Sequence, residues 1–151
     1  MIAVMAVDPG TKGAVAVLSG DGRQVFVQPF KPSMTHAELI AVIRQSLASL
    51  AAYHSSSVFV EKVGYMPTDG GKGANTFGRV DGLIRGGILM AGYPIVDVAP
   101  MMWQAEMDCL TGGDKNVSKR RAQELFPALK ITHAIADALL IAEYGRRRLT
   151  L

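Results

Sequence analysis

The stretch that decides the fold is residues 2–18, IAVMAVDPGTKGAVAVL. An apolar run through Val7 and a second apolar run, residues 13–18, flank the turn signal Asp-Pro-Gly, which is the pattern of two strands joined by a short loop. A third run, residues 23–28, follows the turn signal Gly-Asp-Gly. We therefore expect the chain to begin with an antiparallel meander of three strands.

The rest of the chain alternates helical patterns with short apolar runs. Helices are expected at 36–53, 77–91, around Trp103, 118–126 and 134–148, strands at 57–61 and 93–98, and loops at 65–76 and 111–116. Thr35 and Glu38 form a capping signal for the first helix. The Gly-rich segment 65–76 is expected to be mobile unless something binds it. Because crossover helices require parallel strands, the order predicts an α/β fold with a mixed five-stranded sheet flanked by helices.

Length and composition bound the class of protein. The 151 residues are 49% hydrophobic and 19% charged, which suits a single folded domain spanning 1–151. No apolar run is long enough to cross a bilayer, and the start lacks the features of a signal peptide. A single cysteine, Cys109, fits a reducing compartment. We expect a cytoplasmic protein of a prokaryotic cell with no membrane partner.

Basic residues are concentrated toward the C-terminus. From position 115 onward the chain has five more basic than acidic side chains, counting Lys115, Lys119, Arg120, Arg121, Lys130, Arg146, Arg147 and Arg148 against Glu124, Asp137 and Glu143. Such a segment is typical of a surface that faces phosphate groups. A solvated helix face that keeps the protein soluble is the alternative.

Three acidic residues stand where their neighbours favour burial. Asp8 ends the run IAVMAV, Glu61 ends SVFV, and Asp137 lies inside the helical run AIADALLIA. A carboxylate in apolar surroundings is unfavourable unless it is paired or binds a cation, so three of them suggest a shared site. Strand ends are where such sheets bind ligands, and Mg²⁺ is held by a few carboxylates together with substrate phosphates. The sequence therefore predicts a divalent metal site.

Several segments, taken in order, resemble the RuvC family of Holliday-junction resolvases, most closely its compact phage-type members. They are residues 7–17 (VDPGTKGAVAV), 60–63 (VEKV), 77–79 (FGR) and 133–142 (HAIADALLIA). Pro100, Trp103 and residues 113–127 are also similar to that group, so the resemblance covers nearly the whole chain. It implies an RNase H-like fold, a homodimer, and cleavage of branched DNA that depends on magnesium or manganese.

The resemblance also implies a catalytic set. Asp8 matches the first-strand acid that bridges two metal ions, Glu61 the second acid, and Asp137 the acid of the last helix. The remaining ligand of the family lies one helical turn earlier, where this chain has His133 on the same helix face as Asp137. Position 134, where many relatives place a fourth acid, is alanine. His133 is expected to ligate metal or orient water; capping the helix or contacting DNA is the alternative.

Two Mg²⁺ ions per active site, with Mn²⁺ able to substitute, are expected to clamp the scissile phosphate and to leave a 5′ phosphate. Candidate contacts to the DNA backbone are Lys62, Lys72, Arg79, Lys115, Lys119 and Arg120. Arg79 is favoured because it is expected to open the helix after the Gly-rich segment. Each could equally be an ordinary surface charge.

An aromatic wedge is the feature in which this chain departs from the family. Relatives often carry an aromatic residue just after the second acid, to insert into the unstacked centre of the junction. Three positions after Glu61 this chain has Gly64, and Tyr65 and Met66 follow. Either could act as the wedge, as apolar side chains do between base steps. The change puts the cleavage-sequence preference in doubt and makes three-way junctions and other branched DNA plausible substrates.

A homodimer has a physical argument of its own, because cutting two symmetric strands requires two sites related by a two-fold axis. The helix at 77–91, with its small residues, is the favoured interface, although it could pack on its own sheet instead. Phe77 and Trp103 are expected in the core rather than stacked on DNA.

The sequence predicts a structure-selective endodeoxyribonuclease. Three other readings stay open: a sugar kinase with a similar phosphate loop, a flap or RNA–DNA hybrid nuclease of the same fold, and a branched-DNA-binding module that does not cut.

Overall fold

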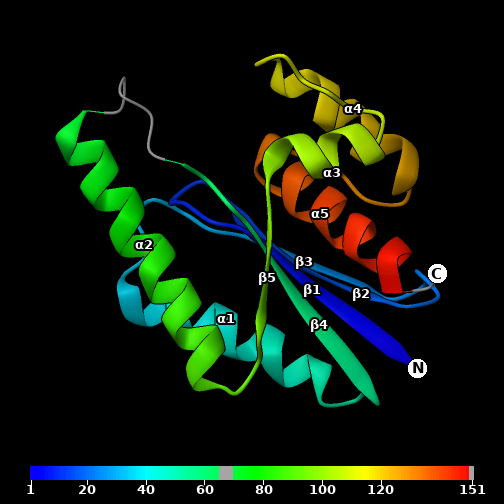
Figure 1. Cartoon of the computed structure of the whole chain (residues 1–151), viewed down its shortest axis with the longest axis horizontal. Helices are drawn as coiled ribbons and strands as arrows, with labels where there is room; N and C mark the ends of the chain where they lie inside the picture. The colour runs from blue at the N-terminus through cyan, green and yellow to red at the C-terminus, as the bar shows by residue number, and fades with distance from the viewer. Residues whose placement is uncertain (65–69, 150–151) are drawn as a thin grey trace.

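The computed structural model describes residues 1–64 and 70–149. Its strands form one mixed sheet in the order β3-β2-β1-β4-β5 (Figure 1). Their bounds are β1 (Ile2–Asp8), β2 (Ala14–Ser19), β3 (Val25–Pro29), β4 (Ser55–Glu61) and β5 (Ile95–Val98). The first three strands form the expected antiparallel meander, and β4 and β5 add to it in parallel. The predicted α/β fold with a mixed five-stranded sheet is confirmed.

Helices cover both faces of this sheet (Figure 1). Their bounds are α1 (His36–Leu50), α2 (Gly71–Met90), α3 (Pro100–Glu106), α4 (Lys115–Leu125) and α5 (His133–Leu149). The capping signal before α1 forms as expected, because the Thr35 side chain accepts from the Glu38 backbone and the Glu38 side chain accepts from the Thr35 backbone. Helices α1 and α2 lie on one face, and α3, α4 and α5 on the other.

The central strand β1 supplies both cores. Because side chains alternate along a strand, Met5 and Val7 face the α1 and α2 side while Val4 and Ala6 face α5. All four are fully buried. Burying an aliphatic side chain of this size contributes about 1.5–3 kcal/mol, so this strand is held firmly from both sides. Its carboxyl end, where Asp8 stands, is therefore a fixed point of the molecule.

Helix α5 packs very close to the sheet. A Cβ atom at Gly145 would lie 2.7 Å from the Phe59 ring and 2.9 Å from Val4. Only glycine permits this approach, and it lets the buried face of α5 sit directly on β1, β2 and β4. Trp103 is completely buried in the same core, as expected, whereas Phe77 on α2 is only half-buried.

Several predicted boundaries were wrong. Helix α2 begins at Gly71, not at residue 77, so much of the segment expected to be a mobile loop is helical and Arg79 lies well inside the helix rather than opening it. Helix α4 begins at Lys115 rather than 118 because Asp114 caps it, its side chain accepting from the backbone of Asn116. The Gly-rich, polar composition of these segments is typical of a loop, but tertiary packing of a helix can override the low helix propensity of its residues.

Smaller shifts affect other ends. Strand β4 begins at Ser55 rather than 57, β5 begins at Ile95 rather than 93, and α5 begins at His133 rather than 134. Such ends are the least certain part of any pattern-based assignment. The proposed wedge residues Tyr65 and Met66 lie outside the described residues. In residues 1–64 and 70–149, no helix combines the length and apolar character that crossing a membrane requires.

Candidate active site

Asp8 and Glu61 are brought together by the register of two parallel strands. Val7 of β1 stands opposite Val60 of β4, and each strand ends one residue later, in Asp8 and Glu61. Neighbouring strands lie about 4.8 Å apart, so the two carboxylates start side by side at the carboxyl edge of the sheet. The turn after β1 folds back tightly, since a Cβ at Gly13 would collide with the backbone carbonyl of Asp8.

Asp137 reaches the same edge from α5. It is half-buried, and Ala136 and Ala138 on either side of it are fully buried. Within the described residues its Oδ1 is enclosed by protein and has no hydrogen-bond partner. The Ser118 hydroxyl of α4 lies near this carboxylate and lowers its pKa. An unsatisfied buried oxygen costs about 1–3 kcal/mol, so this atom marks a place that a cation or an ordered water would fill.

The three carboxylates act on one another electrostatically. Burial raises the pKa of Asp8 well above its usual range, and the charges of Glu61 and Asp137 raise it further. Burial raises the pKa of Glu61 to about 6, and Asp137 adds to the shift. Burial also raises the pKa of Asp137. Because the charge of Asp137 raises the pKa of both Asp8 and Glu61, the three acids share one local environment, and a divalent cation would relieve their repulsion.

Basic and neutral side chains complete the surroundings. Lys115, the first residue of α4, lowers the pKa of all three acids and so stands near each of them. It lines a cavity of about 380 Å³ together with Asp8, Asp137, His133 and Lys12. His133 is exposed at this cavity, and its charge also lowers the pKa of Asp137. The structure thus places His133 beside two of the acids that the sequence grouped with it.

Glu61 has additional restraints on its position. The indole Nε1–H of Trp103 donates to its Oε1 at 2.8 Å, a contact that opposes the upward pKa shift. The guanidinium of Arg85 donates to its backbone carbonyl at 3.3 Å. Arg85 itself pairs with Asp81 and Asp97, which ties α2 and β5 to the end of β4.

The side chains around Asp137 suit a hard divalent cation only in an open site. In the described part of the chain, no three His, Cys, Asp or Glu side chains are gathered closely enough to hold a metal ion unaided. Mg²⁺ often uses one or two carboxylates and completes its shell with water and substrate phosphates. The unpaired Oδ1 of Asp137 and the mutual repulsion of the acids fit an open site of that kind. They do not fit a closed cage made of protein ligands alone.

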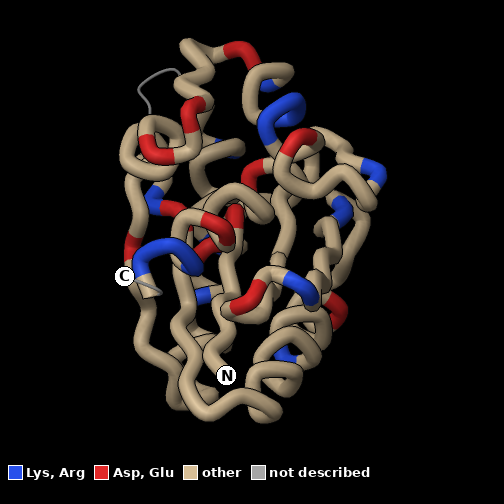
Figure 2. The backbone as a smooth tube through the Cα atoms, turned by 90° about the vertical axis from the view of Figure 1, so that its right-hand side faces the viewer, with Lys and Arg blue, Asp and Glu red and all other residues tan. Residues whose placement is uncertain are grey.

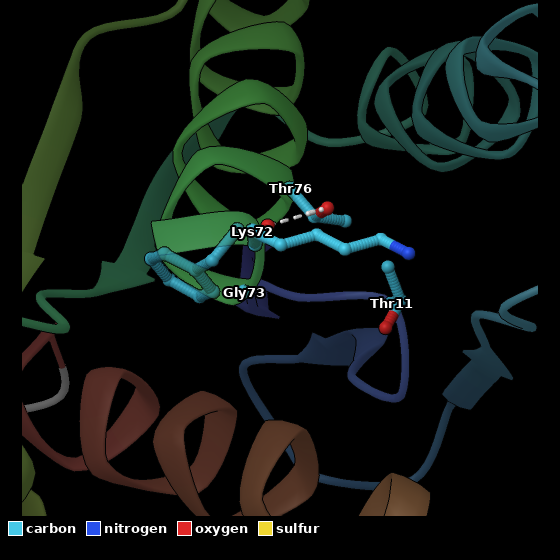
Figure 3. A pocket seen from close by; sticks show the side chains of 5 residues that line it. Thr11, Lys72, Gly73 and Thr76 are labelled. Atoms are coloured by element: carbon cyan, nitrogen blue, oxygen red, sulfur yellow. Dashed lines mark hydrogen bonds between the residues drawn. The ribbon is translucent and has the colours of Figure 1, made fainter. Parts of the chain in front are cut away.

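A second cavity borders the loop that joins β1 and β2. It measures about 370 Å³ and is lined by Thr11 of that loop and by Lys72, Gly73, Thr76 and Phe77 of α2. Figure 3 shows the Lys72 side chain extending past Thr76 with its ammonium group toward Thr11. Thr11 lines this cavity, and Lys12 lines the cavity that contains Asp8 and Asp137, which we call the acidic cavity. The same loop therefore borders both cavities. The pair of lysines gives each cavity a cation suited to phosphate.

The other proposed DNA contacts are scattered. Lys62 follows β4 and is exposed, Arg79 is exposed on α2, and on α4 Arg120 is exposed while Lys119 is half-buried. None of these four lines either of the two cavities described above. In Figure 2 basic and acidic segments are interspersed on the face that is shown.

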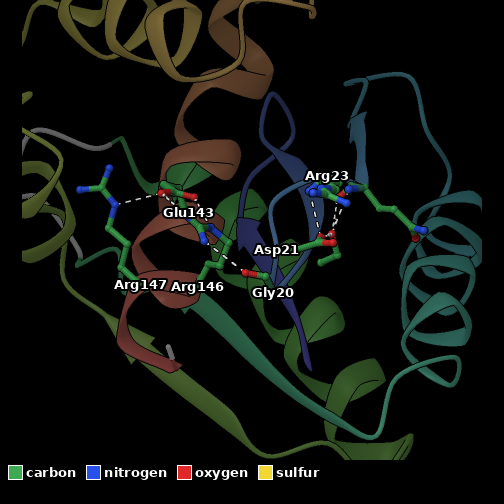
Figure 4. A network of polar contacts seen from close by, with 8 residues as sticks. Gly20, Asp21, Arg23, Glu143, Arg146 and Arg147 are labelled. Atoms are coloured by element: carbon green, nitrogen blue, oxygen red, sulfur yellow. Dashed lines mark hydrogen bonds and ion pairs between the residues drawn. The ribbon is translucent and has the colours of Figure 1, made fainter. Parts of the chain in front are cut away.

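Half of the C-terminal basic residues are engaged in ion pairs. Arg146 and Arg147 surround Glu143, and Arg146 also donates to the carbonyl of Gly20 (Figure 4). Arg148 pairs with Glu106, and Arg121 with Glu124 and more distantly with Asp108. The excess of positive charge predicted for phosphate is therefore partly structural.

Comparison with known proteins supports the fold assignment. No protein-family model matches this sequence, and no curated protein matches it. Among solved structures, RuvC of T. thermophilus in complex with a Holliday junction substrate aligns over 99% of this chain and 96% of its own, with a TM-score of 0.66 and 19% identity. The chain has a RuvC-like fold. Another Thermus thermophilus RuvC structure aligns over 98% of the chain with a TM-score of 0.67 and 19% identity. The RNase H-like fold that the resemblance implied is confirmed at this level.

Sequence reasoning missed part of the site. Trp103 was expected only as a core residue, and Arg85, Ser118 and Lys12 were not singled out. The Trp103 contact joins residues 42 positions apart, which no local pattern reveals. Lys12 had a signal, because it lies in the same Asp-Pro-Gly-Thr-Lys-Gly turn that was used to identify the fold.

Proposed function

We propose that this RuvC-like protein is a Mg²⁺-dependent endonuclease that recognises branched DNA by its structure and resolves four-way junctions by paired symmetric nicks. Mn²⁺ is expected to substitute, and the products should carry 5′ phosphates. The observation that carries the proposal is the group of three carboxylates with pKa values raised by burial, in which the charge of Asp137 acts on both Asp8 and Glu61 and the Oδ1 of Asp137 has no hydrogen-bond partner in the described residues. The similarity of the whole fold to RuvC bound to a Holliday junction supports the choice of substrate.

Each residue of the site has a distinct part in this proposal. Asp8, Glu61 and Asp137 would hold the divalent ions, with Asp8 interacting with both other acids. When bound, two such ions supply an activated water and stabilise the leaving oxygen of a phosphodiester. Lys115 offsets the negative charge of the acids and draws a phosphate into the cavity. His133, at the same cavity, is placed to complete the ligand set or to orient the attacking water.

The DNA backbone is proposed to cross the loop between β1 and β2. Lys12 and Lys115 line the acidic cavity, and Lys72 lines the neighbouring one. Contacts of this kind position a duplex without reading its sequence. Lys62, Arg79, Lys119 and Arg120 remain proposed outer contacts. Tyr65 and Met66 remain the proposed wedge residues.

The proposed homodimer would use the outer face of α2. On its inner face Ile84 and Ile88 are fully buried against α1 and the sheet. On its outer face Gly78, Gly82 and Gly86 are exposed, and a Cβ added to any of them would meet no heavy atom within 4 Å among the described residues. A helix with such a face allows close approach of a second helix. A symmetric pair of sites is what paired nicking of a four-way junction requires.

The test is cleavage of a labelled synthetic four-way junction beside linear duplex, three-way and flap DNA, with Mg²⁺ or EDTA. We expect paired symmetric nicks on the four-way junction with Mg²⁺ and none with EDTA. Asp8→Asn should lose cleavage, because it removes the charge that holds the ions. It should bind the junction as well as the wild type does, because Asn and Asp have nearly the same volume. Asp108→Asn is the matched control, since the Asp108 side chain is 83% exposed and far less enclosed.

Other outcomes would change the assignment. Equal cutting of three-way junctions and flaps would indicate a general debranching nuclease. Binding without cutting by the wild-type protein would indicate a DNA-binding module. Cleavage that persists unchanged in EDTA would contradict the metal site.

A further inference from the structure

Trp103 is the only tryptophan of the chain, and its polar atom points at a proposed metal ligand. The residue is 0% exposed. Its Nε1–H donates to Oε1 of Glu61 at 2.8 Å, and this hydrogen bond is itself buried. A buried indole usually finds some hydrogen-bond partner. Here that partner is a carboxylate at the end of a sheet strand, in the group of acids proposed to hold the ions.

The main chain of Glu61 is fixed independently of its side chain. The Arg85 guanidinium donates to the Glu61 carbonyl at 3.3 Å, and the next backbone amide, that of Lys62, donates to the Val98 carbonyl at 2.8 Å. What stays adjustable is the rotation of the long Glu61 side chain. In residues 1–64 and 70–149, Trp103 is the one hydrogen-bond donor to that carboxylate, so it alone selects which oxygen faces the protein.

We propose that Trp103 is a positioning residue of the nuclease site: its indole holds Oε1 of Glu61 against the core and thereby leaves Oε2 available to a metal ion. This inference rests on the proposed function of the same three acids. Hydrogen bonds from outer residues commonly orient the ligands of a metal site in this way, and losing one typically lowers metal affinity or activity about 10–100-fold. Trp103 touches neither substrate nor metal; it acts through Glu61.

The alternative hypothesis, that Trp103 only stabilises the core, leads to different expected results. If the side chain only filled the core, replacing it with another aromatic residue would change the melting temperature and leave the metal dependence of cleavage alone. If it positions Glu61, removing the single N–H donor would change how the site binds metal even in a folded protein. The readout must therefore report on metal and on the hydrogen bond, not on cleavage alone.

The first measurement leaves Trp103 in place. Because the chain has one tryptophan, ¹⁵N-labelled protein gives one indole N–H resonance. We expect this resonance to move on Glu61→Gln, to move much less on Asp108→Asn, and to broaden when Mn²⁺ is added to the wild type. An indole resonance whose position is unchanged by Glu61→Gln and whose width is unchanged by Mn²⁺ would overturn the proposal.

The second measurement uses Trp103→Phe, which keeps an aromatic ring and removes the donor. We expect the Mn²⁺ dissociation constant of the DNA-free protein to rise about tenfold or more. At saturating junction, the metal concentration needed for half-maximal cleavage should rise in parallel, with KM for the junction unchanged. Tyr144→Phe is the matched control, because Tyr144 is a 5% exposed aromatic of the same core whose ring packs against Phe59.

The outcomes separate this inference from the proposed function. Suppose that the wild type cuts junctions and that folded Trp103→Phe keeps the wild-type Mn²⁺ affinity. This result would overturn the role of Trp103 and leave the proposed function intact. A wild type that binds Mn²⁺ at this site but cuts no branched DNA would overturn the function, and a weakened Mn²⁺ affinity in the variant would still support the role. If Trp103→Phe does not fold, the indole resonance of the wild type and of Glu61→Gln decides.

Discussion

Helix α5 carries two acidic residues, Asp137 and Glu143, whose carboxylates have opposite surroundings. Asp137 and Glu143 lie less than two turns apart on one helix, and both are withdrawn from solvent. Glu143 accepts from Arg146 at 2.7 and 2.8 Å and from Arg147 at 2.9 Å. Asp137 has an enclosed Oδ1 with no partner in the described residues. The comparison separates a carboxylate that stabilises the fold from one that is kept available.

The pKa shifts of the two acids express the same contrast. Burial alone would raise the pKa of Glu143, but the hydrogen bonds and charges of Arg146 and Arg147 outweigh it and leave the pKa below its usual range. For Asp137 burial prevails over Ser118, Lys115 and His133, and the pKa is raised. A folded protein gains stability from the first carboxylate and loses some through the second. That loss is the expected mark of a functional site.

The largest expected effect comes from neutralising the available acid. Asp137→Asn should reduce junction cleavage more than about 100-fold, in the range seen when a group that stabilises transition-state charge is removed. The same change should leave the melting temperature equal or higher, because it removes a charge whose burial outweighs the favourable effect of Ser118, Lys115 and His133. Cleavage rates and thermal unfolding measured on one preparation test both parts. A large fall in melting temperature would contradict the comparison.

Neutralising the paired acid should do the reverse. Glu143→Gln should lower the free energy of unfolding by about 2 kcal/mol, since it leaves two guanidinium groups facing a neutral amide in a largely buried place. The folded variant should cleave junctions at the wild-type rate, because Glu143 pairs with Arg146 and Arg147 and does not line the cavity that contains Asp8 and Asp137. Chemical denaturation and cleavage at a temperature where the variant is folded are the measurements. A cleavage defect in fully folded protein would show that Glu143 and the proposed nuclease site are coupled.

The smallest expected effect is in the pH dependence of stability without metal. Groups with raised folded pKa values, Asp8, Glu61 and Asp137, cost stability when ionised, so stability should rise as pH falls from 7 through about 6, the pKa of Glu61, toward the unfolded values. The lowered pKa of Glu143 acts oppositely. Its contribution is present above the unfolded pKa and is lost as pH falls through the folded one.

Melting temperature measured in EDTA from pH 7 to pH 3 should therefore pass through a maximum between these regimes. Adding Mg²⁺ should stabilise the protein more at pH 7 than at pH 5, because protonated carboxylates bind the ion poorly. In Asp137→Asn the gain on mild acidification should shrink. A melting temperature that falls steadily from pH 7, with or without Mg²⁺, would count against the raised pKa values.

The sheet and most helices were predictable because their signals are local. The apolar runs around Asp-Pro-Gly fixed the first two strands, and Thr35 with Glu38 marked the start of α1. The start of α2 was missed because glycines at 70, 71 and 73 resemble a loop, whereas Ile84 and Ile88 hold the helix by packing that the local letters do not show. The three acids were visible because a charge among apolar neighbours stands out in any sequence.

What remained hidden were the side-chain partners. That Trp103 donates to Glu61 depends on how two distant segments meet, and this is set by tertiary packing. The role of Glu143 was different, because its partners follow it at i+3 and i+4, the spacing of neighbouring side chains on a helix. Arg146 and Arg147 were instead assigned to a phosphate-binding surface, although the spacing from Glu143 predicted that they would pair with it.

The close packing of α5 against the sheet at Gly145 fixes the tilt of the whole helix. A methyl group on the Gly145 Cα would contact Phe59 and Val4, and Asp137 lies about 12 Å away along the same helix axis. A change of tilt at Gly145 would therefore displace Asp137 relative to the cavity that it lines. The position of one carboxylate oxygen in the proposed nuclease site thus depends on a missing side chain at the opposite end of the helix.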